Sequence, residues 1–275
     1  MTDHFGDNPL GRASRYDHGH DPGLLHPVER AGARAELGID DSVLPFRGRD
    51  DWNAWELSWL NGQGKPEVAL AEWSLPCDSP CLIESKSLKL YLNGLANTVF
   101  SGGFEAVTNT LERDLTACAG AGVTVRLWTL ANAAEKPGYG FEGVCLDELD
   151  IAVEDYELKP ALLEPASGRA SEMVYTHLLR SLCPVTGQPD WASVIIDYEG
   201  AAIPREGLLR YLVSFRNHSG FHEQVVERIF TDLQRQYDLQ RLTVQARFTR
   251  RGGLDINPVR STHDEMPENR RTVRQ

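Results

Sequence analysis

Residues 221–248 read FHEQVVERIFTDLQRQYDLQRLTVQARF, and this stretch decides the fold class. Its first half has apolar residues at the spacing of an amphipathic helix, namely Val226, Ile229, Phe230 and Leu233. Residues 242–248 then alternate apolar with polar side chains, which predicts a strand with one buried face. The stretch therefore predicts an α+β fold in which helices cover one face of an antiparallel sheet.

The same order of elements occurs earlier in the chain. Residues 104–127 read FEAVTNTLERDLTACAGAGVTVRL, again a helix pattern followed by alternation. A strand and a short helix are predicted before each stretch, over residues 67–73 and 84–92 and over residues 193–198 and 206–213. Short identities also match, namely Tyr91-Leu92 with Tyr211-Leu212 and Gly103-Phe104 with Gly220-Phe221. We interpret this as an internal duplication; the alternative is two α+β modules that share patterns by chance.

The composition and the interruptions in the pattern divide the chain into four parts. Residues 1–43, rich in Gly, Pro, Asp and His, are predicted to be an irregular arm. Residues 44–160 and 161–260 are predicted to be the two modules, and prolines interrupt the periodicity near their boundary. Residues 261–275 are polar and of mixed charge, which predicts a frayed or disordered tail.

The net charge of the chain makes polyanionic partners unfavourable. The chain has 275 residues, 41% of them hydrophobic, and a net charge of −12, which disfavours nucleic acid and anionic membranes as partners. Its apolar runs stay well short of the roughly 20 residues of a membrane span. The first residues lack the pattern of a secretory signal, and the five cysteines form no disulfide-like framework. These features predict a cytoplasmic protein with free thiols.

The first candidate site is the stretch LCPVTGQPDW at residues 182–191. The spacing of the preceding apolar residues predicts a helix that ends at Cys183; they are Val174, Leu178, Leu179 and Leu182. The C-terminal end of a helix disfavours a thiolate, so activation of Cys183 would have to come from neighbouring groups. Asp190 is a candidate proton-transfer partner. The alternative is a buried structural cysteine.

Two further candidates open predicted helices. In residues 84–89, ESKSLK, a Ser cap would leave backbone N–H groups and Lys86 facing a phosphate or a polar heterocycle. Alternatively, this is an ordinary helix cap with solvated lysines. In residues 221–223, FHE, the adjacent His222 and Glu223 could orient a nitrogen heterocycle. The alternative there is a capping Glu beside a surface His.

The fourth candidate is residues 250–253, RRGG, where two glycines would let backbone approach an anion beside fixed positive charge. It could equally be a basic turn. Nucleotide-binding and zinc-protease motifs are absent from the sequence. The run DHGHD at residues 17–21 looks metal-binding but falls in the predicted disordered arm, and Cys77 with Cys81 lacks the second pair of a zinc site.

Taken in order, four motifs resemble the family of NADPH-dependent 7-cyano-7-deazaguanine reductases, and more narrowly its long, two-module form. The motifs are ESKSLKLY at residues 84–91, CPVTGQPDW at residues 183–191, FHE at residues 221–223 and RGG at residues 251–253. The resemblance covers roughly residues 44–260. Four motifs in one order are far more specific than any one of them.

The resemblance implies a tunnelling fold, with two tandem ββααββ modules whose antiparallel sheets carry helices on one face. It implies that a second subunit completes a barrel-like assembly, so we expect a homodimer. It also implies the reaction: a nitrile is reduced to an aminomethyl group by two NADPH, without metal or flavin, in queuosine biosynthesis. A different enzyme inserts the product into transfer RNA, so no direct nucleic-acid partner is expected.

The resemblance also assigns roles to residues by matching position. Cys183 would attack the nitrile carbon to form a covalent thioimide, and Asp190 would act as general acid and base. The residues expected around the deazaguanine are Ile83, Glu84, Ser85, His222 and Glu223. Those expected to contact NADPH are Ser85, Lys86, Arg251 and Gly252.

Two other classes of function stay open. Another tunnelling-fold enzyme, such as a pterin-forming cyclohydrolase, would share the architecture but would need a metal constellation that the sequence does not offer. A non-catalytic heterocycle-binding relative would share the fold but would tolerate any residue at positions 183 and 190. The presence of both Cys183 and Asp190 argues against the second class.

Overall fold

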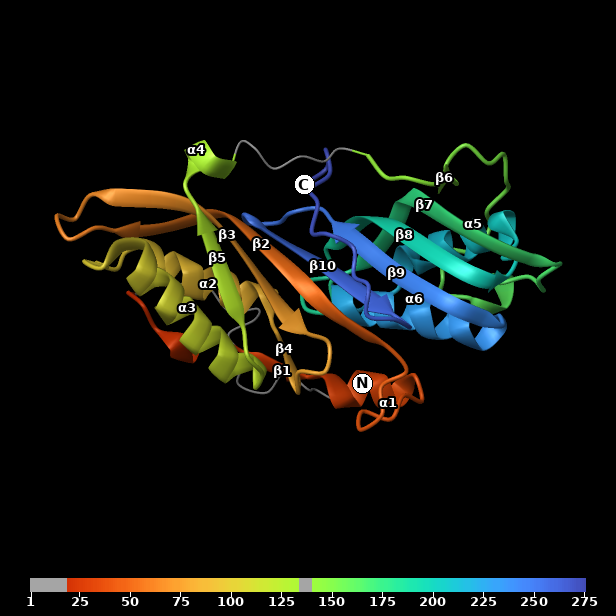
Figure 1. Cartoon of the computed structure of the whole chain (residues 1–275), viewed down its shortest axis with the longest axis horizontal. Helices are drawn as coiled ribbons and strands as arrows, with labels where there is room; N and C mark the ends of the chain where they lie inside the picture. The colour runs from red at the N-terminus through yellow and green to blue at the C-terminus, as the bar shows by residue number, and fades with distance from the viewer. Residues whose placement is uncertain (1–18, 134–139) are drawn as a thin grey trace. The chain divides into compact units, whose positions relative to one another are not determined.

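The computed structural model describes residues 19–133 and 140–275, which form two compact units (Figure 1). The first unit is made of the described residues within 1–32, 52–135 and 251–254, and the second of those within 33–51, 136–250 and 255–275. Both contain helices and sheet, which confirms the predicted α+β class. Because these units interleave along the chain, the module boundaries drawn from the sequence stay a prediction.

In the first unit, three strands lie in the order β5-β3-β2, and β1 pairs with β4 separately. Figure 1 shows α2 and α3 on one side of these strands. The core includes Trp52 and Trp73, whose rings stack with centroids 5.9 Å apart. The elements with residues in this unit are η1 (Pro22–Leu24), β1 (Pro27–Glu29), β2 (Arg47–Leu60), β3 (Pro66–Pro76), β4 (Cys81–Ile83), α2 (Ser85–Ala96), α3 (Gly103–Ala119), β5 (Thr124–Trp128) and α4 (Leu130–Ala133).

In the second unit, the strands lie in the order β10-β9-β8-β7-β6. The long strands are antiparallel, whereas β6 is parallel to β7, so this sheet is mixed rather than purely antiparallel as predicted. Helix α6 buries the apolar face foreseen from its spacing, including Ile229, Phe230 and Leu233. The elements are α1 (Arg30–Glu36), β6 (Val144–Cys145), η2 (Pro160–Leu162), β7 (Arg169–Leu182), β8 (Pro189–Ala201), α5 (Arg205–Val213), η3 (Ser214–Asn217), α6 (His222–Gln236), β9 (Leu239–Phe248) and β10 (Leu254–Ser261).

The helix predicted before Cys183 is wrong, because those residues belong to strand β7. A break in the register between Thr176 and Leu179 interrupts the pairing of β7 with β8. Such a bulge moves the buried side chains to the other parity: Val174 and Thr176 are buried before it, and Leu179 and Ser181 after it. When the buried positions of a strand shift from even to odd numbers in this way, apolar residues fall three or four positions apart. That spacing is also the one that predicts a helix.

The irregular arm predicted at the N-terminus and the disorder predicted for the C-terminal tail are also wrong for the residues that the structure describes. Residues 19–43 form η1, β1 and α1, whereas residues 1–18 lie outside the described part. The tail packs on the second unit, where the Gln275 side-chain amide donates to the Phe248 carbonyl oxygen at 2.9 Å. Because this tail lies against β9, the polar side chains Gln245 and Arg247 are buried too. Strand β9 therefore has two covered faces instead of the expected one.

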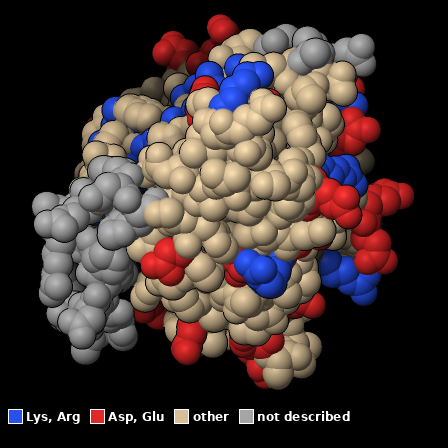
Figure 2. Space-filling view, turned by 90° about the vertical axis from the view of Figure 1, so that its left-hand side faces the viewer, with Lys and Arg blue, Asp and Glu red and all other residues tan. Residues whose placement is uncertain are grey.

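Helix length, the state of the cysteines and the surface charge can be stated for the described residues. No helix in the described part is long and apolar enough to cross a membrane. The five cysteines, all of which the structure describes, carry free thiols in it. On the face drawn in Figure 2, acidic and basic side chains lie mainly around a broad uncharged area, and no continuous basic stripe crosses the described part of it.

A buried ion network stabilises the second unit. The Arg260 guanidinium is fully buried and contacts the Asp50 and Glu227 carboxylates, each at 2.8 Å. Arg34 of α1 contacts the same Glu227 at 2.9 Å, so one carboxylate of α6 holds two guanidinium groups. The network ties α1 and β10 to the helix that begins with His222.

We expect Arg260→Leu to lower the free energy of unfolding by roughly 3–5 kcal/mol, because it leaves the Asp50 and Glu227 carboxylates buried without this cation. Urea unfolding measures the effect. The matched control is Arg241→Leu, since Arg241 pairs with Glu265 at 2.8 Å in a solvent-exposed position. That control should lose less than about 1 kcal/mol. Equal losses in the two variants would contradict the assigned role of the network.

Candidate active site

Cys183 lies in the turn between β7 and β8, not at the end of a helix. Its N–H donates to the Gln188 carbonyl oxygen, and the Gly187 N–H donates to the Cys183 carbonyl oxygen, both at 2.9 Å. Gly187 has a φ of 66°, a conformation that favours glycine. The Cys183 side chain is buried, with 8% of the residue exposed. The turn therefore fixes the position of the thiol, and the helix-end argument about its charge no longer applies.

The segment before α6 lies directly beside this turn. The Leu182 N–H donates to the His218 carbonyl oxygen at 2.8 Å, and the Gly220 N–H donates to the Leu182 carbonyl oxygen at 3.1 Å. These bonds bring the start of α6, which carries His222 and Glu223, next to the residue that precedes Cys183. Burial, followed by the charge of Arg228, lowers the pKa of His218 below its ordinary value.

Asp190 and His222 form a pair within the second unit. The His222 Nε2 lies 3.3 Å from the Asp190 Oδ2, and the two side chains are only 11% and 4% exposed. Asp190 lies at the start of β8, opposite Ser181 of β7. The pair joins two of the candidate segments that the sequence marked separately, and a paired carboxylate and imidazole can hold and move a proton.

One aromatic ring packs on this pair, and another aromatic residue follows Asp190 in the sequence. The His222 ring stacks on the Phe248 ring with centroids 3.7 Å apart and planes 2° from parallel. The next residue after Asp190, Trp191, lies near two guanidinium groups, those of Arg180 at 5.4 Å and Arg216 at 5.6 Å from its ring centroid. The sequence analysis did not single out Phe248. Its alternation marked Phe248 as buried, but gave no sign of what the ring packs against.

Glu223 is buried in the first turn of α6. The helix begins at His222, and the Phe221 N–H before it donates to the Gln224 side-chain oxygen at 3.0 Å. The positive end of the helix dipole favours a carboxylate at this place. A buried carboxylate can accept hydrogen bonds from the N–H groups of a heterocycle.

In the first unit, Glu84 is the helix cap of α2, where a Ser cap was predicted. Its buried carboxylate accepts from the N–H groups of Lys86 at 2.9 Å and Ser87 at 2.7 Å. These two N–H groups are therefore already bonded and are not available to a phosphate, which corrects that part of the interpretation. Ile83, the residue before the cap, pairs with Pro27 in the small β1-β4 sheet. Ser85 and Lys86 follow in the first turn and are partly exposed.

Arg251 and Gly252 lie in the glycine turn before β10, also in the first unit. Gly252 has a φ of 59°, and a Cβ there would lie 3.1 Å from the Lys89 Cδ. Lys89 of α2 therefore lies against this turn, and the sequence analysis missed it. The available signal was its spacing, because Lys86 and Lys89 are three residues apart and lie on one face of a helix.

The predicted site residues thus fall into two groups, one in each unit. Those in the second unit are Cys183, Asp190, His222 and Glu223, and those in the first are Ile83, Glu84, Ser85, Lys86, Arg251 and Gly252. Within the second unit, hydrogen bonds and the contact between Asp190 and His222 bring together the segments that carry Cys183, Asp190 and His222. That the two groups share one substrate stays a prediction.

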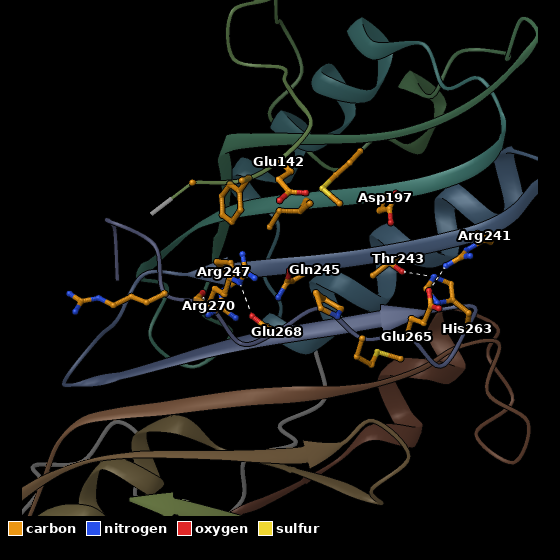
Figure 3. Close-up of a pocket in the computed structure, with 17 residues that line it drawn as sticks. Glu142, Asp197, Arg241, Thr243, Gln245, Arg247, His263, Glu265, Glu268 and Arg270 are labelled. Atoms are coloured by element: carbon orange, nitrogen blue, oxygen red, sulfur yellow. Dashed lines mark hydrogen bonds and ion pairs between the residues drawn. The ribbon is translucent and has the colours of Figure 1, made fainter. Parts of the chain in front are cut away.

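A cavity of about 430 Å³ lies elsewhere on the second unit, and the predicted site residues are not among those that line it (Figure 3). Alternate residues of β9 face it, with Arg241, Thr243, Gln245 and Arg247 in a row. The tail supplies the opposite wall. Several charges are paired there, with Arg270 and Glu268 at 2.9 Å. The sequence did not predict this cavity, because it forms only when residues after 261 pack over the strand.

The run DHGHD at residues 17–21 carries side chains of the types that bind metal ions. Asp17 and His18 lie outside the described residues. His20 Nε2 contacts the Asp114 Oδ2 at 2.7 Å inside the first unit. Among residues 19–133 and 140–275, no three His, Cys, Asp or Glu side chains gather in a way that could hold a metal ion.

Cys183 lies in the turn that leads to Asp190, and Asp190 pairs with His222 at the start of α6. A cysteine in a turn that leads to a carboxylate–imidazole pair suits an enzyme that uses covalent catalysis. Comparison with known proteins identifies the family. A family model described as "Nitrile reductase, 7-cyano-7-deazaguanine-reductase N-term" matches residues 16–127, and one described as "QueF-like protein" matches residues 189–267. The chain is 52% identical over 271 residues to the NADPH-dependent 7-cyano-7-deazaguanine reductase of Burkholderia pseudomallei (strain 1106a), covering 98% of each chain.

A second relative gives the same result. The NADPH-dependent 7-cyano-7-deazaguanine reductase of Burkholderia mallei (strain SAVP1) is 51% identical over 271 residues, again covering 98% of each chain. The chain belongs to the 7-cyano-7-deazaguanine reductase family. A crystal structure of an archaeosine synthase described as QueF-like, in its apo form, matches 37% of this chain and 99% of its own, with 18% identity and a TM-score of 0.30.

Proposed function

We propose that this chain reduces the nitrile of 7-cyano-7-deazaguanine to the aminomethyl group of 7-aminomethyl-7-deazaguanine, with two NADPH, in queuosine biosynthesis. The observation that carries this function is the 52% identity over 98% of the chain to a reductase of that name. The pairing of Asp190 with His222 near the Cys183 turn supports the chemistry.

The first step takes place on Cys183. Its Sγ adds to the nitrile carbon, so that a C–S bond forms and one π bond of the nitrile breaks, while the S–H proton passes through Asp190 to the nitrile nitrogen. The thioimide that results splits a four-electron reduction into two steps. NADPH supplies a hydride for each of them when it is bound. Between them the C–S bond breaks as a C=N bond forms, and Asp190 carries the proton that leaves the nitrogen to the Cys183 sulfur, which restores the thiol. The proton that accompanies each hydride comes from water.

The substrate is held by the start of α6. His222 Nε2 is engaged with Asp190, and its Nδ1 is buried without a hydrogen-bond partner among the described residues. Nδ1 is therefore the imidazole atom left for the heterocycle. Glu223 accepts from the amino and ring N–H groups of the deazaguanine. The resemblance adds Ile83, Glu84 and Ser85 of the first unit to the proposed substrate-binding residues.

The residues proposed for NADPH fit a phosphate-bearing ligand. Lys86 and Arg251 are cationic, and Gly252 has a backbone conformation that favours glycine, with Lys89 packed against it. Ser85 offers a hydroxyl in the first turn of α2. Fixed cations suit the extra 2′-phosphate that separates NADPH from NADH.

The proposed enzyme has two tandem ββααββ modules, forms a homodimer and acts in the cytoplasm. Equivalent hydrogen bonds support the duplication: the Tyr91 hydroxyl donates to Asp114 and the Tyr211 hydroxyl donates to Asp232, each at 2.8 Å. Tyr91 and Tyr211 are the tyrosines that match between the two copies in the sequence. A tyrosine of the shorter helix thus bonds to an aspartate of the longer helix in each unit.

An anaerobic assay tests this function by following NADPH oxidation with 7-cyano-7-deazaguanine. We expect two NADPH consumed per nitrile and the aminomethyl product by mass spectrometry. Without NADPH, intact mass should show one substrate added to the wild-type chain and none added to Cys183→Ala. Turnover of GTP with zinc, in the absence of nitrile reduction, would instead favour a cyclohydrolase.

A further inference from the structure

We propose that Phe248 is a positioning residue that holds the His222 imidazole against Asp190, and that Gln275 anchors Phe248 in turn. This inference rests on the proposed function, in which His222 and Asp190 serve the nitrile reduction. Neither Phe248 nor Gln275 touches the reacting atoms in that scheme. Their effect is on the orientation of His222, which contacts Asp190 and is proposed to hold the heterocycle.

The contact between the two rings is specific in its geometry. The Phe248 ring is fully buried at the end of β9, and it stacks on the His222 ring at 3.7 Å with planes only 2° from parallel. This flat contact keeps the imidazole ring parallel to the Phe248 ring and prevents it from tilting. The contact of His222 Nε2 with Asp190 at 3.3 Å then fixes its rotation within that plane. Together the two contacts determine where His222 Nδ1 points.

The end of β9 is itself held from two sides. The Thr249 N–H donates to the Trp191 carbonyl oxygen at 2.8 Å, which ties the residue after Phe248 to the residue after Asp190. The Gln275 side-chain amide donates to the Phe248 carbonyl oxygen at 2.9 Å and to the Asn257 Oδ1 at 2.6 Å. Gln275 is only 3% exposed, so both hydrogen bonds are shielded from water.

The tail that carries Gln275 is fixed as well. The Arg274 guanidinium donates to the His177 carbonyl oxygen at 2.7 Å, and the Thr272 N–H donates to the Gln275 side-chain oxygen at 3.1 Å. The polar tail therefore packs on the second unit and acts on the site through Phe248. Its bonds explain why an otherwise polar segment is ordered there.

Phe248→Leu tests the stacking, because leucine keeps an apolar side chain but removes the flat ring. We expect kcat for nitrile reduction to fall by about 10- to 100-fold, because a small displacement of a catalytic group lowers the rate by this order. The KM for NADPH should not change. Phe230→Leu is the matched control. Phe230 is also fully buried in this unit, but its ring meets Phe46 edge-on at 5.5 Å. That variant should lose stability while keeping its kcat.

A double-mutant cycle separates positioning from general stability. In a His222→Ala background, Phe248→Leu should lower kcat less than about twofold further, because the ring that it holds is gone. The same 10- to 100-fold loss in both backgrounds would overturn the proposal. Gln275→Leu removes the hydrogen bond to the Phe248 carbonyl oxygen together with those to Asn257 and Thr272. It should lower kcat roughly two- to tenfold, which is the size expected for the loss of the Phe248 bond alone; no change would overturn the anchoring role. Val273→Ala, at an exposed tail position, is its control.

Proton NMR of the histidine rings tests the same contact without any turnover. The stacked Phe248 ring should displace the His222 ring-proton resonances, and Phe248→Leu should remove this displacement while Phe230→Leu keeps it. Unchanged His222 resonances in Phe248→Leu would overturn the proposal even in an active enzyme. If the wild-type chain fails to reduce the nitrile, the proposed function is wrong, and the resonances still decide whether Phe248 holds His222.

Discussion

Replacing Cys183 with alanine should remove nitrile reduction and leave binding of the deazaguanine measurable. The thiol is the atom that forms the covalent bond in the proposed reaction, so without it the nitrile has no nucleophile. We expect kcat to fall by a factor on the order of 10⁴ or more. Binding should persist, because His222 and Glu223, which are proposed to hold the heterocycle, are intact in this variant.

The measurement is NADPH oxidation together with the affinity for the nitrile substrate determined by calorimetry. Cys145→Ala is the matched control, since Cys145 belongs to the same unit but lies on the short edge strand β6. That variant should keep wild-type turnover and still give the covalent adduct. An alanine variant at position 183 that reduces the nitrile would exclude the thioimide mechanism.

Asp190→Asn should slow turnover by roughly 10²-fold or more, because an amide cannot take up and return the proton that a carboxylate carries. The variant also replaces the charged partner of His222, which lies 3.3 Å away, by a neutral one. The shape of the side chain is nearly unchanged, so we expect the fold and the Cys183 turn to be preserved.

Steady-state rates at saturating NADPH measure this effect. Asp197→Asn is the control, because Asp197 lies on the same strand β8 and its side chain is exposed. The control should turn over at the wild-type rate. A wild-type rate in Asp190→Asn as well would show that the proton comes from another group.

The helices and most strands could be predicted from the sequence, because local periodicity records which side of each element is buried. Helix α6 and strand β9 lie where the spacing of residues 221–248 placed them. The prediction failed at β7, where the register break after Thr176 changed the phase of the buried side chains. A bulge depends on the pairing partner, and that partner is absent from a local pattern.

The motifs marked the segments that carry the candidate site but not its contacts. The cap of α2 is the Glu84 carboxylate rather than a serine hydroxyl. In the folded chain this carboxylate reaches the N–H groups of Lys86 and Ser87. Lys89 reaches the glycine turn at Gly252 across a long stretch of sequence. Both facts depend on how the segments pack.

The sequence by itself determined the α+β class, the repeated order of elements and the residues that belong to the motifs of the family. Only the tertiary structure decided that His222 meets Asp190, that Phe248 lies flat on the His222 ring and that Gln275 reaches back to β9. Periodicity is a property of neighbouring residues, whereas these contacts join segments whose separation along the chain carries no information about their distance in space. Sheet register and the path of the tail set those distances.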